Sequence, residues 1–120
     1  MTDTKELGRF GESQAERYLR RRGYRTVKKN FSCRFGEIDL IVADRKYIVF
    51  VEVKLRRSAD FAAAREFVTA AKQQRIRTTA ALWLSQHETG LQPRFDVIEI
   101  YAPRGAEGKI TLNHIENAFE

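Results

Sequence analysis

Charged residues interrupt two apolar runs that are otherwise typical of buried β-strands. The first run is Gly36–Val42, and the second, after a short polar segment, is Val49–Lys54. Strands with a near-continuous apolar sequence are usually buried on both faces. An ionised side chain buried in such a strand costs several kcal/mol unless it is paired or bound to a metal. The presence of Asp39, Glu52 and Lys54 in these runs therefore requires an explanation.

The polar segment between the runs predicts a hairpin that brings the charges together. If Arg45 and Lys46 form a two-residue loop, Asp39 lies directly opposite Glu52, with Cβ atoms about 5 Å apart. Arg-Lys is not the Asn-Gly or Gly-X sequence that such a loop prefers. A register shifted by one residue, or a bulge, is therefore the alternative.

Facing carboxylates in a hairpin favour a bound divalent cation. Alternation along the first strand puts Glu37, Asp39 and Ile41 on one face. Alternation along the second puts Glu52 and Lys54 on one face. Like charges that face each other are destabilising, whereas Mg²⁺ prefers one or two carboxylates together with waters and phosphate oxygens. The alternative is structural: Glu52 and Lys54 form an ion pair within their strand, and Asp39 caps a backbone group.

Asp39, followed after a turn by Glu52-Val53-Lys54, resembles the PD-(D/E)xK motif of restriction-endonuclease-like nucleases. The longer string resembles the small bacterial YraN-like family of predicted nucleases, which are related to archaeal Holliday junction resolvases. The proline of the formal motif is absent, since Ile38 precedes Asp39. The matching pieces are Gly8, Gly11-Glu12, Ala15, Asn30, Gly36-Glu37-Ile38-Asp39-Leu40-Ile41, Phe50-Val51-Glu52-Val53-Lys54, Arg56, Lys72 and Arg94-Phe95-Asp96.

This resemblance implies an α/β fold with a mixed, restriction-endonuclease-like β-sheet flanked by helices on both faces. It also implies a metal-dependent endonuclease that hydrolyses phosphodiester bonds in DNA, including branched or structured DNA. In the superfamily, the residues matching Asp39 and Glu52 hold Mg²⁺ or Mn²⁺, with the carbonyl of the residue matching Val53 as a third ligand. The residue matching Lys54 orients the attacking water and stabilises the transition state.

Two helical residues extend the expected catalytic set. Glu12 matches an acidic active-site residue on the first helix, although a glutamate early in a helix is also favoured by the helix dipole. Gln73 matches a polar residue that related nucleases carry on a later helix. Two other functions stay open. One is a nucleic-acid-binding module that keeps the nuclease fold without catalysis, and the other is a nuclease that acts on RNA.

Apolar periodicity and turn residues predict the elements of the fold. Small residues on one face of the first helix, at Gly8, Gly11 and Ala15, are expected to let that helix approach the sheet closely. The segment Ser58–Phe67 is expected to be a loop or a short helix over the site. The expected elements are a helix over Thr4–Arg22, strands over Tyr24–Phe31, Gly36–Val42 and Val49–Lys54, a helix over Thr69–Ser85, a strand over Phe95–Tyr101, a turn over Gly105–Gly108 and a short strand over Ile110–His114.

The charge of the chain favours a polyanionic partner. The formal net charge is +6 over 120 residues, a length that suggests a single domain over residues 1–120. Among several basic clusters, those beside the expected site are predicted to contact nucleic acid, most simply DNA. These are Arg56, Arg57, Lys72 and Arg75. The alternative for each cluster is a solvated surface.

Composition excludes several other classes of site. A single cysteine, Cys33, excludes an intramolecular disulfide, and His87 and His114 lack the spacing of metal ligands. The polar N-terminus and the absence of a long apolar run predict a cytosolic protein that does not enter a membrane. Analogy with resolvase-like enzymes suggests a homodimer.

Overall fold

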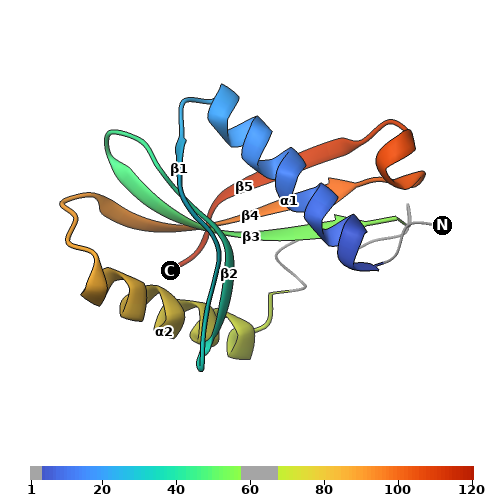
Figure 1. The fold of residues 1–120 in the computed structure, drawn as a ribbon. Coiled ribbons are helices and arrows are strands. Elements are labelled where there is room, and N and C mark those ends of the chain that lie inside the picture. The colour runs from blue at the N-terminus through green and yellow to red at the C-terminus, as the bar shows by residue number, and fades with distance from the viewer. Residues whose placement is uncertain (1–3, 58–67) are drawn as a thin grey trace.

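The computed structural model describes residues 4–57 and 68–120, in which a mixed β-sheet lies between two helices (Figure 1). The elements are α1 (Thr4–Arg21), β1 (Arg25–Cys33), β2 (Gly36–Ala43), β3 (Tyr47–Arg56), α2 (Ala70–Gln86), β4 (Gln92–Tyr101), the short 3₁₀ helix η2 (Gly105–Glu107) and β5 (Thr111–Phe119). The strand order is β1-β2-β3-β4-β5. This α/β arrangement is compatible with a restriction-endonuclease-like fold and confirms the expected fold class. The segment Ser58–Phe67 lies outside the described residues.

Strand direction explains where the helices lie. The pair β3–β4 is parallel, and the other neighbouring pairs are antiparallel. A parallel pair requires a crossover connection, whereas antiparallel strands can be joined by a tight turn. Helix α2 lies in this crossover and covers one face of the sheet, and α1 covers the other (Figure 1).

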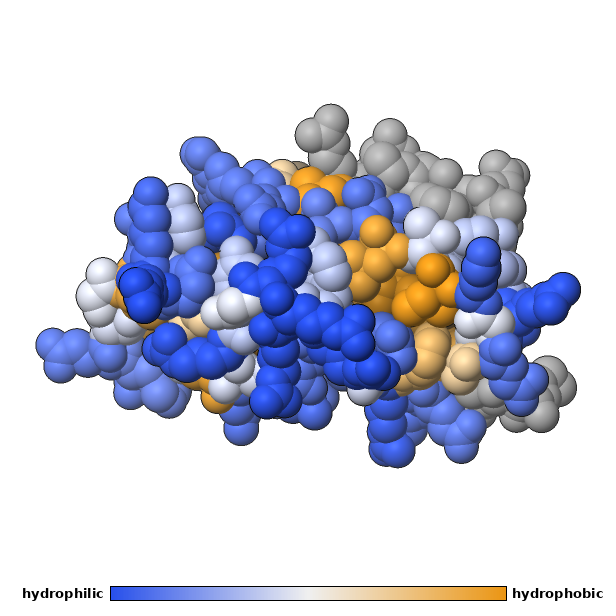
Figure 2. All heavy atoms as spheres, turned by 90° about the horizontal axis from the view of Figure 1, so that it is seen from above, coloured by the Kyte–Doolittle hydropathy of each residue, from blue (hydrophilic) through white to orange (hydrophobic). Residues whose placement is uncertain are grey.

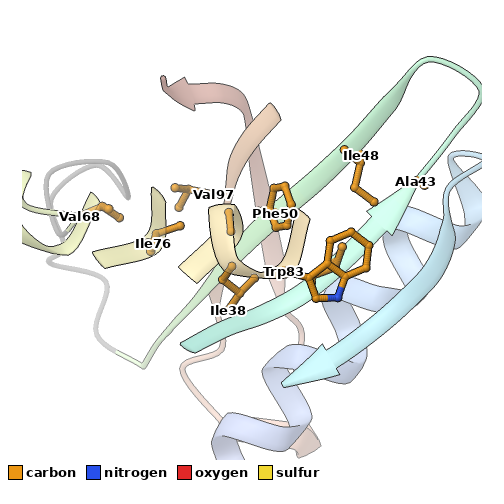
Figure 3. Packing of buried hydrophobic residues seen from close by; sticks show 10 residues of the cluster. Ile38, Ala43, Ile48, Phe50, Val68, Ile76, Trp83 and Val97 are labelled. Atoms are coloured by element: carbon orange, nitrogen blue, oxygen red, sulfur yellow. The ribbon is translucent and has the colours of Figure 1, made fainter. Parts of the chain in front are cut away.

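Each helix buries its own apolar cluster against the sheet. On the α2 face, Ile76 and Trp83 pack with Ile38 and Phe50, as Figure 3 shows, and Ala80 belongs to the same cluster. The Trp83 and Phe50 rings meet edge to face, with centroids 6.0 Å apart. On the α1 face, the cluster is built by Ala15, Leu19, Leu40, Val42, Val49, Val51, Ile98, Ile100 and Ala102. The two clusters fix the central strands from both sides.

Close approach of α1 to the sheet depends on Gly11. A Cβ added at Gly11 would lie 3.1 Å from Leu55 Cδ1, so a larger residue would push α1 away from β3. The same expectation for Gly8 is wrong, because a Cβ there would meet nothing within 4 Å. Gly23 follows α1 with a φ of +95°, a left-handed conformation that glycine adopts without strain and that ends the helix.

The hairpin between β2 and β3 has the expected register. Its pairs run from Ala43↔Ile48 to Leu40↔Val51, which places Arg45 and Lys46 in the turn. Asp44 Oδ1 accepts hydrogen bonds from the amides of Lys46, at 2.8 Å, and of Tyr47, at 2.7 Å. An aspartate that bonds to backbone amides two and three residues ahead stabilises a turn without an Asn-Gly sequence.

Strict alternation along β2 is wrong at one point. Ile38 and Ile41 both belong to the cluster on the α2 face, although residues three apart in a regular strand lie on opposite faces. The strand therefore changes its facing between them, and Asp39 lies within this irregular stretch.

The last strands extend further than expected. Strand β5 continues to Phe119 rather than ending at His114, and β4 begins at Gln92 rather than at Phe95.

In the view of Figure 2 the surface is mostly hydrophilic, and apolar side chains gather in one larger patch. None of the helices in residues 4–57 and 68–120 has the length and apolar character that a membrane span requires.

Candidate active site

Asp39 lies just beyond the end of the β2–β3 ladder. The last pair is Leu40↔Val51, and past it Asp39 Oδ2 accepts a hydrogen bond from the Val53 amide at 2.8 Å. The carboxylate thus replaces a backbone acceptor where the strands diverge. Asp39 thus caps a backbone group, as the structural alternative expected. The hydrogen bond occupies only one of the two carboxylate oxygens.

Glu52 is a nearly buried carboxylate that contacts two lysines. Its residue is 9 % exposed, and it is held on β3 by neighbours in the core. Lys72 Nζ, from the first turn of α2, lies 2.7 Å from Glu52 Oε1. Lys54 Nζ lies 3.4 Å from the same oxygen, so the expected ion pair within β3 is also present. Two cations therefore converge on a single carboxylate oxygen.

Neighbouring carboxylates disfavour the charged form of Asp39. Burial and the charge of Glu52 raise the pKa of Asp39 to about 7, against a lowering by the Val53 hydrogen bond. The charges of Glu12 and Glu37 raise it further. Close to neutral pH, Asp39 is therefore shared between its neutral and charged forms.

Glu12 interacts electrostatically with the carboxylates of the site, while its catalytic role stays a prediction. Burial raises the pKa of Glu12, a hydrogen bond with the Asn30 side chain opposes this, and the charges of Glu37 and Glu52 add to the increase. Asn30 has a positive φ of 52°, a conformation that asparagine tolerates better than most residues. The unusual backbone at Asn30 thus accompanies a contact with a candidate catalytic residue.

Glu37 is a site residue that the sequence analysis did not select. It lines a small pocket of about 190 Å³ together with Gly36, Glu52, Lys72, Arg75 and Ile76. Its exposed carboxylate contributes to the raised pKa values of both Glu12 and Asp39. The sequence signal that could have identified Glu37 was its position two residues before Asp39 in the first apolar run. The sequence did not reveal that the side chains of β2 change faces in this stretch.

The donor set fits a hard divalent cation better than a zinc ion. Among residues 4–57 and 68–120, no three His, Cys, Asp or Glu side chains converge closely enough to hold a metal by themselves. Structural zinc sites need four such ligands, whereas Mg²⁺ keeps several waters and uses one or two carboxylates. Asp39 and Glu52 are two neighbouring carboxylates and fit the second requirement.

Two residues that the sequence predicted for the site, Gln73 and Arg56, make contacts within the fold that a purely structural role would explain. Gln73 Nε2 donates to the Val68 carbonyl at 3.0 Å, which ties α2 to the residue before its N-cap. Arg56 is half-buried, and its charge opposes the rise that burial causes in the pKa of Glu99. The catalytic role of Gln73 and the nucleic-acid contact of Arg56 stay predictions. Arg57 is exposed, and Arg75 lines the pocket.

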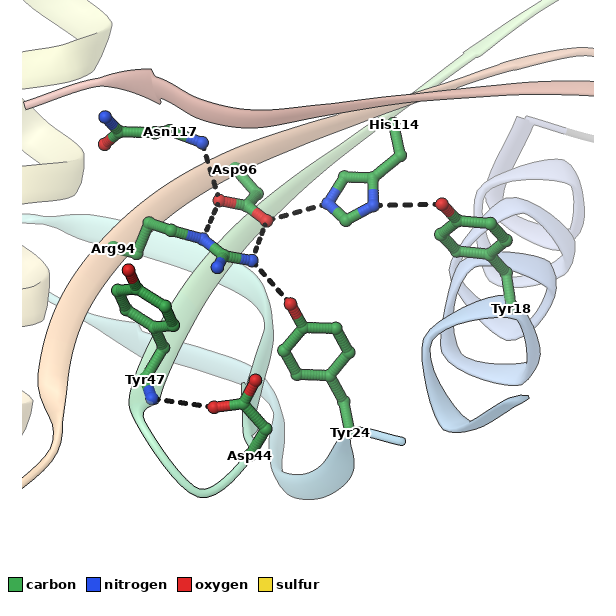
Figure 4. Close-up of polar contacts among 8 residues, drawn as sticks. All are labelled: Tyr18, Tyr24, Asp44, Tyr47, Arg94, Asp96, His114 and Asn117. Carbon is green, nitrogen blue, oxygen red and sulfur yellow. Dashed lines mark hydrogen bonds and ion pairs between the residues drawn. The ribbon is translucent and has the colours of Figure 1, made fainter. Parts of the chain in front are cut away.

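A second buried carboxylate, Asp96 on β4, lies in a network on the α1 side of the sheet (Figure 4). Arg94 donates to both of its oxygens, from Nε at 2.9 Å and from Nη2 at 2.8 Å. His114 Nε2 lies 2.7 Å from Asp96 Oδ2, and the Asn117 amide donates to Oδ1 at 3.0 Å. Every oxygen of this carboxylate is therefore satisfied by the protein itself.

Tyrosines complete this network. The Tyr18 hydroxyl lies 3.1 Å from His114 Nδ1, and Arg94 Nη2 donates to the Tyr24 hydroxyl at 2.7 Å. Burial alone raises the pKa of Asp96, but hydrogen bonds from His114, Arg94 and the Asn117 amide outweigh it and hold the pKa below its usual value. A larger cavity of about 690 Å³ borders Arg94 and Tyr47 and contains none of the candidate catalytic residues.

Sequence comparison assigns the chain to a family. The model of "Uncharacterised protein family UPF0102" matches residues 11–100. The chain belongs to UPF0102. This is the YraN family, so the resemblance seen in the sequence is confirmed. The UPF0102 match includes every residue of the candidate site named above, from Glu12 to Arg75.

UPF0102 relatives match this chain over nearly its whole length. A UPF0102 protein of Pelotomaculum thermopropionicum is 43 % identical and covers 99 % of this chain and 100 % of its own. One of Caldanaerobacter subterraneus is 45 % identical over 96 % of this chain and 95 % of its own. A third, from Nocardia farcinica, is 41 % identical over 98 % and 91 %. Their names give no activity, so the comparisons establish the family and leave the function to be argued from the site.

Proposed function

We propose that this protein is a metal-dependent endonuclease that hydrolyses phosphodiester bonds in DNA. The observation that carries the proposal is the juxtaposition of the half-buried Asp39 with Glu52; burial, together with the charge of Glu52, raises the pKa of Asp39 to about 7. A protein without a cation to bind gains no stability from such a pair. The matching PD-(D/E)xK pattern and the net charge of +6 support the same function.

Asp39, Glu52 and the Val53 carbonyl would hold Mg²⁺ or Mn²⁺. A divalent cation in such a site supplies a Lewis acid for a phosphoryl oxygen and lowers the pKa of a bound water. The side chains of this chain have the remaining tasks. Asp39 already has one oxygen fixed by the Val53 amide, so its carboxylate is oriented before any ligand arrives. Glu12 would contact the site through water or help to hold a second ion.

Lys54 would act on the substrate. Burial and the neighbouring charge of Lys72 lower the pKa of Lys54, whereas Glu52 opposes this change. A partly buried ammonium group held beside Glu52 is positioned to orient a water and to stabilise negative charge on the phosphorus centre. As a cation, it is a poor metal ligand, which separates its role from that of Glu52.

A cleavage panel tests the proposed function. The substrates are linear duplex, single strand, flap, four-way junction and RNA, each with Mg²⁺, Mn²⁺ or a chelator. We expect cleavage of at least one DNA substrate with either metal and none with chelator. Glu52→Gln should abolish cleavage, whereas Glu88→Gln, which removes an exposed carboxylate between α2 and β4, should not.

Two outcomes would favour other functions. Binding of duplex without cleavage of any substrate would indicate a non-catalytic nucleic-acid-binding module. Cleavage of RNA alone would indicate an RNA-directed nuclease. Cleavage that continues in chelator would exclude the metal-dependent mechanism.

A further inference from the structure

Lys72 holds the acidic side chain that the proposed metal needs. Its Nζ lies 2.7 Å from Glu52 Oε1, closer than Lys54 Nζ at 3.4 Å. The Lys72 side chain is 28 % exposed, and it lines the small pocket with Glu37 and Arg75. Lys72 thus reaches both the carboxylate inside the site and the solvent at the mouth of the pocket.

The position of Lys72 in α2 is unfavourable apart from this contact. Thr69 is the N-cap and accepts a hydrogen bond from the Lys72 amide, so Lys72 is the third residue of the helix. This position commonly carries Glu or Gln, because the helix N-terminus has a positive partial charge. The first turn of α2 contains no acidic residue. The charge of Glu52 therefore compensates for a lysine where a helix usually disfavours one.

A cation at Glu52 would change this balance. Lys54, Lys72 and a divalent ion would then converge on one carboxylate. Lys54 is carried by β3, two residues from Glu52, whereas Lys72 comes from α2 and lines the small pocket, which Lys54 does not. A ligand that enters this pocket therefore meets Lys72 rather than Lys54. Lys72 lies in the first turn of α2 and shares the pocket with Arg75, and a helix N-terminus beside two cationic side chains favours an anionic ligand such as a phosphate oxygen.

We propose that Lys72 pairs alternately with Glu52 and with a phosphate oxygen of the substrate, so that the binding of cation and of phosphodiester reinforce each other. This inference rests on the proposed function, since it requires a cation at Glu52 and a polyanionic substrate. It assigns Lys72 two ligands in turn instead of a fixed structural ion pair. Because coupling between two ligands is reciprocal, it is measurable from either side.

Titration calorimetry with Mn²⁺ in the absence of nucleic acid measures the first half of the proposal. Lys72→Met removes the competitor for Glu52, and we expect the Kd for Mn²⁺ to fall at least threefold. Lys72→Arg should keep the wild-type Kd within twofold. The control is Lys46→Met, which removes the same charge from the β2–β3 turn, about 20 Å along the chain from Glu52. Its Kd should not change.

The second half is measured with a short DNA duplex and Ca²⁺, which is expected to support binding without cleavage. In wild type, saturating Ca²⁺ should tighten duplex binding at least tenfold. In Lys72→Met the tightening should be at least threefold smaller, whereas Lys46→Met should retain it. Circular dichroism establishes that each variant is folded, and Lys72→Gln replaces Lys72→Met if the latter is not.

The outcomes separate this inference from the proposed function. If wild type binds no divalent cation, both are overturned. If wild type binds the cation and Lys72→Met has an equal or weaker affinity, Lys72 does not compete for Glu52 and only this inference fails. Unchanged coupling in Lys72→Met would likewise overturn the phosphate contact while leaving the nuclease assignment intact.

Discussion

Asp39 and Asp96 are aspartates of neighbouring regions of the same sheet, but their surroundings are opposite. Asp96 receives four hydrogen bonds or ion-pair contacts from Arg94, His114 and Asn117, and its pKa is held below the usual value. Asp39 receives a hydrogen bond from the Val53 amide, but burial and the charges of nearby carboxylates raise its pKa to about 7. The protein itself satisfies both oxygens of Asp96, whereas one oxygen of Asp39 has a hydrogen bond from the protein and the proposed cation would bind at this carboxylate. The difference is the one expected between a structural carboxylate and a metal ligand.

The largest expected effect is on the stability of the Asp96 network. Asp96→Asn removes the charge that compensates the buried guanidinium of Arg94, and loss of one partner of a buried pair costs about 3–5 kcal/mol. Asp39→Asn relieves repulsion and should leave the free energy of unfolding equal or higher in chelator. Urea unfolding of both variants measures this contrast. Equal losses in the two variants would remove the distinction between the sites.

Cation binding should depend on Asp39 and not on Asp96, the reverse of the expected effects on stability. At ten times its Kd, Mn²⁺ should stabilise wild type by about 1.4 kcal/mol, a shift of several degrees at most. Asp39→Asn should lose this stabilisation. Asp96→Asn should keep it at a temperature where the variant is folded. Thermal unfolding with and without Mn²⁺ is the measurement, and an equal shift in wild type and Asp39→Asn would rule out Asp39 as a ligand.

The pH dependence of stability should have opposite signs for the two aspartates. The folded-state pKa of Asp39 is about 7, above its ordinary value of 3.8, so its ionisation removes stability as pH rises from about 4 to 7. The folded-state pKa of Asp96 is below 3.8, so its stabilisation is present above pH 4 and is lost in acid.

This linkage is measured by unfolding in chelator at several pH values. The stability of Asp39→Asn relative to wild type should increase by at least about 1 kcal/mol between pH 4 and 7, the equivalent of roughly one pKa unit. The deficit of Asp96→Asn should shrink as pH falls below 4. A relative stability of Asp39→Asn that is constant across this range would contradict the raised pKa.

The smallest effect concerns two arginines at the end of β3. Arg57 is exposed, whereas Arg56 is half-buried beside Glu99. If Arg57 contacts a phosphate, Arg57→Ala should reduce the log–log salt slope of duplex binding by about one, equally for all sequences. Arg56→Ala should instead lower stability. An unchanged slope in the Arg56→Ala, Arg57→Ala double variant would exclude a phosphate contact for both residues.

Local rules were sufficient to predict the strands that carry the site. The apolar runs and the polar turn between them gave the β2–β3 register, because Asp44 stabilises that turn through its own side chain. The helix with Gly11 and Glu12 was likewise predicted from its spacing. These features depend on residues close together in the sequence, where periodicity and turn chemistry decide the structure.

Features that depend on distant residues could not be predicted. The Asp96 network joins Tyr18, Tyr24, Arg94 and His114, which come from four separate elements or loops, and no spacing in the sequence relates them. The contact of Lys72 with Glu52 depends on how α2 is rotated over the sheet. The extent of β5 was missed because its polar residues and the positive φ of Asn117 weaken the strand pattern after His114.

Lys54 tests the central claim most directly, because it separates a ligand from a catalytic group. The measurement is single-turnover cleavage of a substrate that wild type cuts, made beside Mn²⁺ titration of the same variants. We expect Lys54→Met to bind Mn²⁺ at least as well as wild type but to cleave on the order of a hundredfold more slowly, as when one transition-state donor is deleted. Glu52→Gln should lose both properties. Cleavage by Lys54→Met at the wild-type rate would contradict the account and leave Lys54 as a structural partner of Glu52.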